Sequence, residues 1–490
     1  MQAAGAIPFF RQPLRITPPG QRALPTFDGL TAFAPFWGAA ALFSIAGDPQ
    51  GLIGREGLFY FALAWAIVVN SAVTILYPRK TWALVSLALV TTILYLVRLP
   101  VASNNKTITT AFDLSLLVCA GYLYAKGTLD RSRLYELIRM PARLLLATMY
   151  FYGIYHKINT DFLDPTVSCA VGLYKPLAAP FGVEDNLIGR YAAIWATFVI
   201  EGIAIVSLFW RKWFAVGLVV ALVFHYIIPI SAYSWYMDFS SLVFALYMLT
   251  MPREASAKVY ELTYTWVVMP LRDTFGRIGV IAPAVALLFL ATSLVLMLTL
   301  AHPGRPALML LHSIFILIWA VVGGAAMTVM VFAAMHYLPY KGSAPAPAPR
   351  WTWIIPVLFF VSCLSPYVGL KTESSINMFS NLRTEGGTTN HLMFSKPPYL
   401  FSYQSEVVKV TDSSSPSLRK SAAQGQLHIL FAVEEYMRRH PNQWVTYVMN
   451  GKTYSHQTAA NLPANSASWL ERKLLIFKTV DPVSPKVCTH

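Results

Sequence analysis

A histidine, a lysine and two aspartates follow directly on an apolar stretch in the segment YGIYHKINTDFLDP, residues 152–165. A lysine amine that is partly withdrawn from water loses basicity, because burial disfavours the charged ammonium form. The neutral amine can then act as a general base near neutral pH. We therefore predict a reaction or binding site at a membrane–water boundary. Lys157 is its base, Asp161 or Asp164 orients that base or donates a proton, and His156 contacts the substrate.

The same residues also have a purely structural interpretation. A lysine at the end of a spanning helix commonly extends to water, and an aspartate four residues later can pair with it. Pro165 disfavours helix at Asp164, so Asp161 and Asp164 need not share a helix face. The sequence leaves both interpretations of Lys157 open.

Four further ionisable residues lie inside or at the edge of apolar stretches, namely Glu201 (ATFVIEGIAIVSLFW), His225 (LVVALVFHYIIPI), Asp113 (TAFDLSLL) and Asp238 (MDFSSLVF). Charged groups are costly inside a membrane, so each is a functional candidate. We expect Glu201 and His225 to face the interior of the helix bundle as candidate catalytic residues, and Asp238 to bind substrate. The alternatives are a paired carboxylate and a hydrogen-bonded structural histidine.

The composition indicates that these residues belong to an integral membrane protein. Of 490 residues, 56% are hydrophobic and 12% are charged, with a mean hydropathy of +0.51, whereas soluble domains carry about 25% charged residues. A spanning helix needs about 20 apolar residues. We predict an all-α polytopic membrane bundle of about 8–11 transmembrane helices. The candidate spans lie near residues 30–47, 58–77, 81–100, 111–125, 143–156, 191–210, 213–232, 239–251, 279–301, 308–335 and 353–370.

The charges of the loops predict an orientation. Eighteen lysines and arginines fall on the side of the N-terminus and seven on the opposite side, and positively charged loops stay in the cytoplasm. We therefore predict a cytoplasmic N-terminal segment (residues 1–29), a transmembrane domain (30–370) and a small extracytoplasmic α+β domain (371–490). No segment alternates basic with aromatic residues, so we attribute the net charge of +15 to topology and expect no nucleic-acid partner.

Three patterns predict the elements of the C-terminal segment. YLFSYQSEVVKV (399–410) is typical of a strand, and QLHILFAVEEYMRRH (426–440) of an amphipathic helix. VTYVMNGKTYS (445–455) predicts a hairpin with a type I′ turn at Asn450-Gly451.

The four cysteines, Cys119, Cys169, Cys363 and Cys488, lack the spacing of a metal site. Cys169 and Cys488 can pair if both face an oxidising compartment, and otherwise all four remain free thiols.

The segment around Lys157 resembles the signature of the HTTM membrane-domain family, which includes vitamin K-dependent gamma-glutamyl carboxylase. In that signature a glycine stands four residues before a lysine, which is followed by Leu and Asp-x-Asp-Trp. The matching positions here are Gly153, Lys157, Ile158, Asn159, Asp161 and Phe162. Phe224-His225 and MFSNLRTEGGTTNHLMF (378–394) are similar to further stretches found in the family. The resemblance implies that Lys157 deprotonates a reduced quinone similar to vitamin K hydroquinone.

Two departures from the carboxylase limit what the resemblance implies. Asn105, in SNNKT, stands where the carboxylase has a histidine, and we take it as a candidate binding residue. The C-terminal segment is also too short to hold the carboxylase's large lumenal domain, which binds the glutamyl substrate. These departures argue against protein carboxylation but leave a quinol or another isoprenoid as substrate.

Three functional hypotheses remain at this point. The first is a carboxylase-like membrane enzyme that uses Lys157 as base and a reduced quinone as cosubstrate. The second is an isoprenoid or terpene cyclase in which Asp161, Asp164 or Glu201 supplies a proton and aromatic side chains stabilise cationic intermediates. The third is a non-enzymatic lipid- or peptide-binding or transport component, with recognition by polar residues of the C-terminal segment: Arg383, Glu385, Asn390 and His391.

Overall fold

The computed structural model describes residues 28–47, 49–52, 54, 56–100, 103–230, 236–270, 273, 305–336, 348–462, 467–480 and 488. The predicted span at 279–301 and the N-terminal segment up to residue 27 lie outside the described residues. Two compact units divide the chain. The first holds residues 1–92, 112–146 and 203–353, and the second holds residues 93–111, 147–202 and 354–490.

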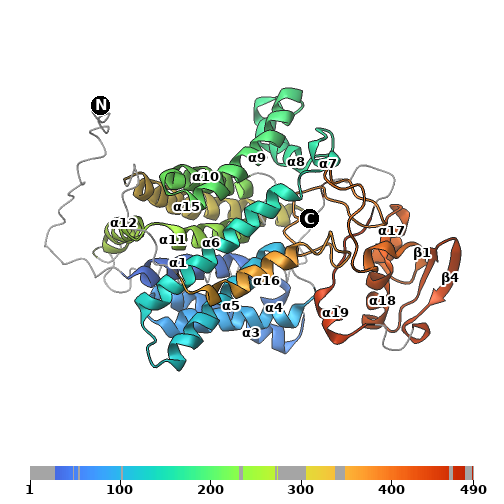
Figure 1. Ribbon diagram of the computed structural model, residues 1–490, viewed down its shortest axis with the longest axis horizontal. Coiled ribbons are helices and arrows are strands. Elements are labelled where there is room, and N and C mark those ends of the chain that lie inside the picture. Colours follow the sequence, from blue (N-terminus) through green and yellow to red (C-terminus); the bar gives the residue numbers. More distant parts are fainter. Residues whose placement is uncertain are drawn as a thin grey trace. The chain divides into compact units, whose positions relative to one another are not determined.

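Helices make up most of the described chain (Figure 1). Seven of them are long and apolar enough to cross a membrane, and these indicate a membrane protein. Their apolar stretches are Gly29–Ala46 (α1), Leu58–Leu76 (α3), Thr81–Arg98 (α4), Asn104–Ala125 (α5), Leu187–Phe209 (α9), Arg211–Ile230 (containing α10, Phe214–Ile230) and Ile316–His336 (within α15, Arg305–His336). All seven correspond to predicted spans.

Three predicted spans have a different form in the structure. The stretch at 143–156 is the second half of a longer helix, α6 (Arg131–Tyr155), whose first half carries several charges. The stretches at 239–251 and 353–370 form shorter apolar helices, α11 (Met237–Thr250) and α16 (Ile354–Cys363).

The first unit is held together by helix packing and by buried polar contacts. Helix α1 packs against α3 and α11, and α10 packs against α15. Asp28 caps α1 by accepting a hydrogen bond from the Leu30 amide at 2.9 Å. The guanidinium of Arg139, buried on α6, donates to the carbonyls of Leu249 (3.0 Å) and Met251 (2.8 Å), which satisfies carbonyls at the end of α11.

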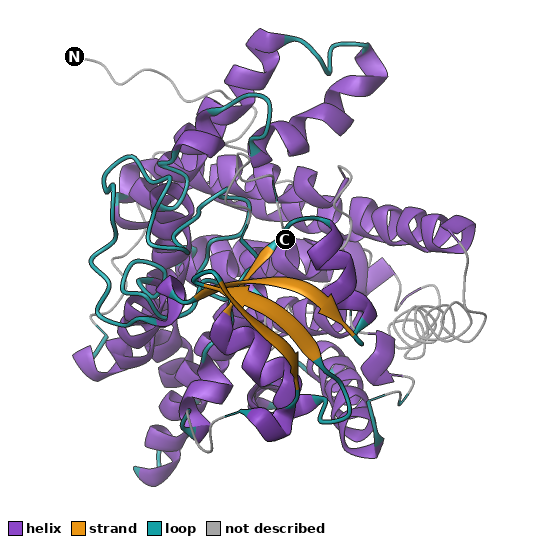
Figure 2. Ribbon diagram, turned by 90° about the vertical axis from the view of Figure 1, so that its right-hand side faces the viewer, coloured by secondary structure: helices purple, strands orange, loops and turns teal. Residues whose placement is uncertain are grey.

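The C-terminal segment contains a small antiparallel sheet (Figure 2). Its strands are β1 (Val407–Ser413), β2 (Leu427–Ile429), β3 (Val445–Met449) and β4 (Lys452–Gln457), in the order β2-β1-β3-β4. The predicted hairpin is confirmed, since Asn450 and Gly451 both have positive φ (51° and 77°).

The predicted strand and helix of the C-terminal segment are only partly correct. Residues 399–406 lie outside β1, and the predicted helix 426–440 begins as β2 and becomes helical only in α18 (Leu430–Arg439). Pairing of Leu427 with Lys409 and of Ile429 with Val407 extends this stretch as an edge strand, so tertiary pairing overrides the helical pattern. Two further helices, α17 (Pro416–Ala423) and α19 (Trp469–Leu474), complete the segment.

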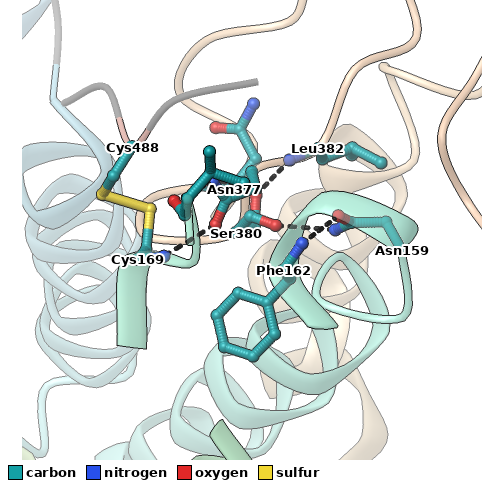
Figure 3. The surroundings of a disulfide bond; sticks show 9 residues. Asn159, Phe162, Cys169, Asn377, Ser380, Leu382 and Cys488 are labelled. Carbon is teal, nitrogen blue, oxygen red and sulfur yellow. Dashed lines mark hydrogen bonds between the residues drawn. A yellow bond between two sulfur atoms is a disulfide. The ribbon is translucent and has the colours of Figure 1, made fainter. Parts of the chain in front are cut away.

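A disulfide between Cys169 and Cys488 ties the end of the chain to α8 (Cys169–Ala178) (Figure 3). The Cys169 amide donates to Oδ1 of Asn381 at 2.9 Å. Cys119 and Cys363 are free and buried. The two cysteines that the sequence left open are therefore paired.

Candidate functional site

Lys157 lies just beyond the last turn of α6, in the second unit. The His156 amide still bonds to the Tyr152 carbonyl (3.0 Å), but the Lys157 amide turns to the nearer carbonyl of Ile154 (3.0 Å), so the helix tightens and ends. The side chain of Lys157 does not reach water, since the residue is only 5% exposed. It is therefore not the solvent-exposed anchor of the structural interpretation.

The ammonium of Lys157 pairs with the carboxylate of Glu201 on α9, with Nζ and Oε1 2.5 Å apart. Glu201 is 7% exposed, so both partners are withdrawn from solvent. Burial favours the neutral form of each group, whereas the opposite charge favours the ionised form. Desolvation is costly for an unpaired charge in such a place, and the pairing offsets that cost.

The second oxygen of this carboxylate takes no part in the pair with Lys157. Oε2 of Glu201 is buried and has no hydrogen-bond partner among the described residues. Buried polar atoms are nearly always hydrogen-bonded, so an orphaned acceptor calls for an explanation. An O–H or N–H group of a bound molecule would satisfy it.

Gly153 makes room for the carboxylate. A Cβ atom at this position would come within 2.9 Å of Oε2 of Glu201, closer than such atoms approach in proteins, and within 3.3 Å of Cδ, which is a tight contact. Gly153 precedes Lys157 by four residues, which is about one helical turn. The glycine leaves space for the Glu201 carboxylate because it has no Cβ, and the lysine brings its amine to the same carboxylate. This is a physical reason for the Gly-x-x-x-Lys spacing of the sequence.

The turn after Lys157 is fixed by Asn159, which is fully buried. Its side-chain amide donates to the carbonyls of His156 (2.7 Å) and Ser380 (2.6 Å), and its Oδ1 accepts from the Phe162 amide (2.8 Å). The last of these bonds caps the short helix α7 (Thr160–Leu163). Figure 3 shows the hydrogen bonds of Asn159 with Phe162 and Ser380 as dashed lines. Asn159 therefore fixes the conformation of the turn that follows α6.

The aspartates of the opening segment lie away from this pair. Asp161 is in the first turn of α7, where Oδ1 accepts from the Thr160 hydroxyl (2.8 Å). Asp164 caps its own turn by accepting from the amide and hydroxyl of Thr166 (2.8 and 2.6 Å). The expected i,i+4 pairing of Lys157 with Asp161 does not form, because α6 ends at Tyr155 and Glu201 is the partner of Lys157 in the part of the chain described.

His156 and His391 pack in an aromatic cluster beside Lys157. Nε2 of His156 bonds to the Ser375 carbonyl (2.9 Å), so this nitrogen donates and Nδ1 accepts from the Tyr367 hydroxyl (2.7 Å). His391 likewise donates from Nε2 to the Tyr155 carbonyl (2.9 Å). Burial lowers the pKa of His391, and the bond to Tyr155 partly offsets this effect. Both histidines, predicted as binding residues, bond to protein groups and hold the cluster together.

The segment that meets His156 has an unusual backbone. Ser374, Ile376, Phe379 and Asn381 all have φ between 54° and 60°. This left-handed region is unfavourable for a β-branched residue such as Ile376. The Ile376 amide is held by Oδ1 of Asn104 at 2.7 Å. Strained backbone of this kind persists where the surroundings over-determine it, and it gathers at functional sites.

The remaining candidates of the second unit bond to neighbouring protein groups. Asn105, in the first turn of α5, accepts a hydrogen bond from the Ser103 hydroxyl. The Arg383 amide donates to Oδ1 of Asn390 (2.8 Å), and Oε2 of Glu385 accepts from the Thr384 amide (3.0 Å). These bonds shape the loop 380–391.

Three candidates belong to the first unit. His225 on α10 is 2% exposed and packs between the rings of Phe224 (5.3 Å) and Phe239 (5.2 Å). Asp238 accepts from the Phe239 amide (2.7 Å), and the fully buried Asp113 accepts from Trp37 (3.1 Å) and Thr91 (2.5 Å). The prediction that Glu201 and His225 face inward agrees with the burial of both.

Sequence reasoning named Asn390 as a recognition residue and Asn159 as a position of the family signature, but it missed Asn381 and the bonds that these three side chains make around the turn after Lys157. An asparagine carries no charge that would mark it in an apolar sequence. The available signal was the polar stretch 378–394, which is rich in Asn and Thr. Among the described residues, no cluster of His, Cys, Asp or Glu is placed to hold a metal ion.

The chain matches no protein-family model, no curated protein and no solved structure. The resemblance to the HTTM family therefore stays a prediction, and the function has to be argued from the geometry of the site.

Proposed function

We propose that this protein is a membrane enzyme that removes a proton from a lipid-soluble isoprenoid or quinol, with the Lys157–Glu201 pair as its base. The observation that carries the proposal is a buried pair at 2.5 Å whose second carboxylate oxygen has no partner in the described part of the chain. A buried ionisable pair of this kind is a functional-site candidate.

The proton count of the pair supports this role. When a substrate hydroxyl loses its proton, the proton between Lys157 and Glu201 moves to the carboxylate and the freed amine of Lys157 takes the substrate's proton, so the pair gains one proton and ends as an ammonium on Lys157 and a neutral acid on Glu201. The substrate oxyanion then lies beside a positive charge that is no longer neutralised by Glu201. In a site of low polarity this charge stabilises the anion strongly.

A reduced quinone fits the available groups. Its hydroxyl is the donor that Oε2 of Glu201 lacks, and the aromatic cluster of Tyr155, Tyr367 and Phe394 offers ring faces nearby. When bound, such a cosubstrate would lose its hydroxyl proton to the pair and supply an anion that can be oxidised. The role of this chain is to take the proton and to exclude water, since Lys157, Glu201 and His156 are all buried.

The cyclase hypothesis receives less support from the geometry. Asp161 and Asp164 are engaged with Thr160 and Thr166 near the surface, and the Glu201 carboxylate accepts from the Lys157 ammonium instead of holding a proton to donate. We also propose that the C-terminal segment is extracytoplasmic. The loop charges favour this placement, and so does the Cys169–Cys488 disulfide, since disulfides persist in oxidising compartments.

Mass spectrometry of lipids that co-purify with the protein tests the proposal. Wild type, Glu201→Gln and the control Glu261→Gln, at a partly exposed carboxylate that pairs with Lys258, are purified in mild detergent and incubated with vitamin K hydroquinone. We expect the quinol or an endogenous prenyl lipid to be retained by wild type and the control, and to be depleted in Glu201→Gln. Retention of bulk phospholipid alone by all three would contradict the proposal and favour a non-enzymatic role.

A further inference from the structure

The C-terminal segment is bonded to the ends of two consecutive candidate spans. Nζ of Lys473, on α19, donates to the carbonyls of Val97 (3.3 Å) and Leu99 (3.2 Å) at the end of α4. The Ile376 amide donates to Asn104 at the start of α5 (2.7 Å). Only a short connection joins α4 to α5, so these two helix ends lie at the same boundary of the bilayer.

A third contact lies at the end of α6, the helix that follows α5. There the Leu392 amide donates to the Ile158 carbonyl (2.9 Å), and His156 bonds to the Ser375 carbonyl. Direct hydrogen bonds thus join the C-terminal segment to the ends of α4 and α6 and to the start of α5.

Large apolar side chains are exposed at these same contacts. On α19, Trp469 is 72% exposed and Leu470 is 56% exposed. Trp469 precedes Lys473 by four residues, so the two share a helix face, and Lys473 faces the end of α4. Leu392 (56%) and Met393 (61%) are exposed immediately beside the bond to Ile158.

We propose that α19 and the turn 391–394 lie in the head-group layer of the bilayer, with their apolar side chains in lipid. Tryptophan and lysine are the residues that gather at this level of a membrane. Lipid is the occupant that we infer, because both exposed groups belong to elements bonded to the ends of membrane helices. The C-terminal segment would then be seated on the membrane beside Lys157. This inference does not depend on the chemistry proposed for that residue.

An environment-sensitive fluorophore tests the inference in the full-length protein. Single cysteines are introduced as Leu470→Cys and Met393→Cys, with Lys452→Cys at the exposed hairpin as the control. Each is labelled with a nitrobenzoxadiazole maleimide in phosphatidylcholine nanodiscs, with or without doxyl-labelled lipid. The unsubstituted protein, in which Cys119 and Cys363 are buried, measures background labelling.

We expect blue-shifted emission at positions 470 and 393 that loses intensity with doxyl lipid, and water-like, unquenched emission at position 452. Water-like emission at 470 and 393 would overturn the inference. Blue-shifted emission that doxyl lipid does not quench would also overturn it, since a protein partner would then cover these side chains.

Discussion

At the scale of single residues, the central feature is that Lys157 and Glu201 neutralise each other where neither reaches water. Removal of one partner leaves a buried, uncompensated charge, which costs about 3–5 kcal/mol. A substitution that removes the lysine side chain would therefore lower stability and activity together, and the two effects could not be separated. Substitutions that keep the charge, or that act on the space around the carboxylate, separate the two.

Lys157→Arg keeps a cation beside Glu201 but removes an amine that can deprotonate, because a guanidinium stays charged in proteins. We expect turnover of the native lipid substrate to fall by about 10²-fold or more, while expression and melting temperature stay near those of wild type. Lys175→Arg, at a half-exposed lysine on α8, is the control. Full turnover by Lys157→Arg would show that Lys157 is a structural anchor.

Gly153→Ala tests whether the glycine positions the carboxylate. The new Cβ would meet Oε2 of Glu201 at 2.9 Å and displace it from Lys157, so we expect activity to fall about tenfold or more, as misplaced catalytic groups do. Gly202→Ala is a matched control on α9, since nothing lies within 4 Å of its Cβ position. That change should leave activity intact and alter the free energy of unfolding by at most about 1 kcal/mol. Equal activity of the two variants would remove Gly153 from the site.

At the scale of elements, the end of α6 and the loop 374–394 form one bonded assembly. The Thr160 amide bonds to the Asn390 carbonyl (3.0 Å), and the Leu392 amide bonds to Ile158 (2.9 Å), so the chain after Lys157 pairs with the C-terminal segment as a short bridge. The loop is held by these bonds and by buried asparagines, which is consistent with its left-handed residues. Loss of this loop would expose Lys157.

The buried His391 makes this assembly sensitive to acid. Because burial lowers its pKa in the folded state, the unfolded chain takes up a proton near pH 6.5 while the folded chain does not. Stability is therefore full above that pH and is lost as the pH falls through and below it. We expect the melting temperature to fall between pH 7.5 and 5, and to fall less in His391→Asn.

The control for this titration is His440→Asn, at an exposed histidine after α18. It should show the same pH dependence as wild type. An unchanged pH dependence in His391→Asn would assign the acid sensitivity to other groups, such as His428, whose pKa is also lowered by burial.

At the scale of the whole molecule, seven helices of the described residues are long and apolar enough to cross a membrane, and the orientation predicted from the loop charges can be tested directly. We expect Ser417→Cys, on an exposed turn of α17, to react with a membrane-impermeant maleimide in intact cells. Lys126→Cys, in the exposed loop after α5, should react only after permeabilisation. The reverse pattern would invert the topology.

The sequence by itself predicted a membrane protein and the location of the seven long apolar helices. Runs of about 20 apolar residues either cross a membrane or form a buried core. The type I′ turn at Asn450-Gly451 follows from the local conformational preference of these two residues and needs no tertiary contact. The helix expected at 426–440 was partly wrong, because β1 recruits Leu427–Ile429 through pairing that no local pattern encodes.

The sequence also placed Lys157 and Glu201 among the candidates, since charge in an apolar sequence is rare and costly. It could not pair them, because the two residues are 44 positions apart on different helices and a nearer aspartate offered a local partner. Only the tertiary structure decided between those partners. In the structure α6 ends at Tyr155, so Asp161 does not follow Lys157 on the same face of a helix. The missing side chain of Gly153 leaves space that the Glu201 carboxylate of α9 fills.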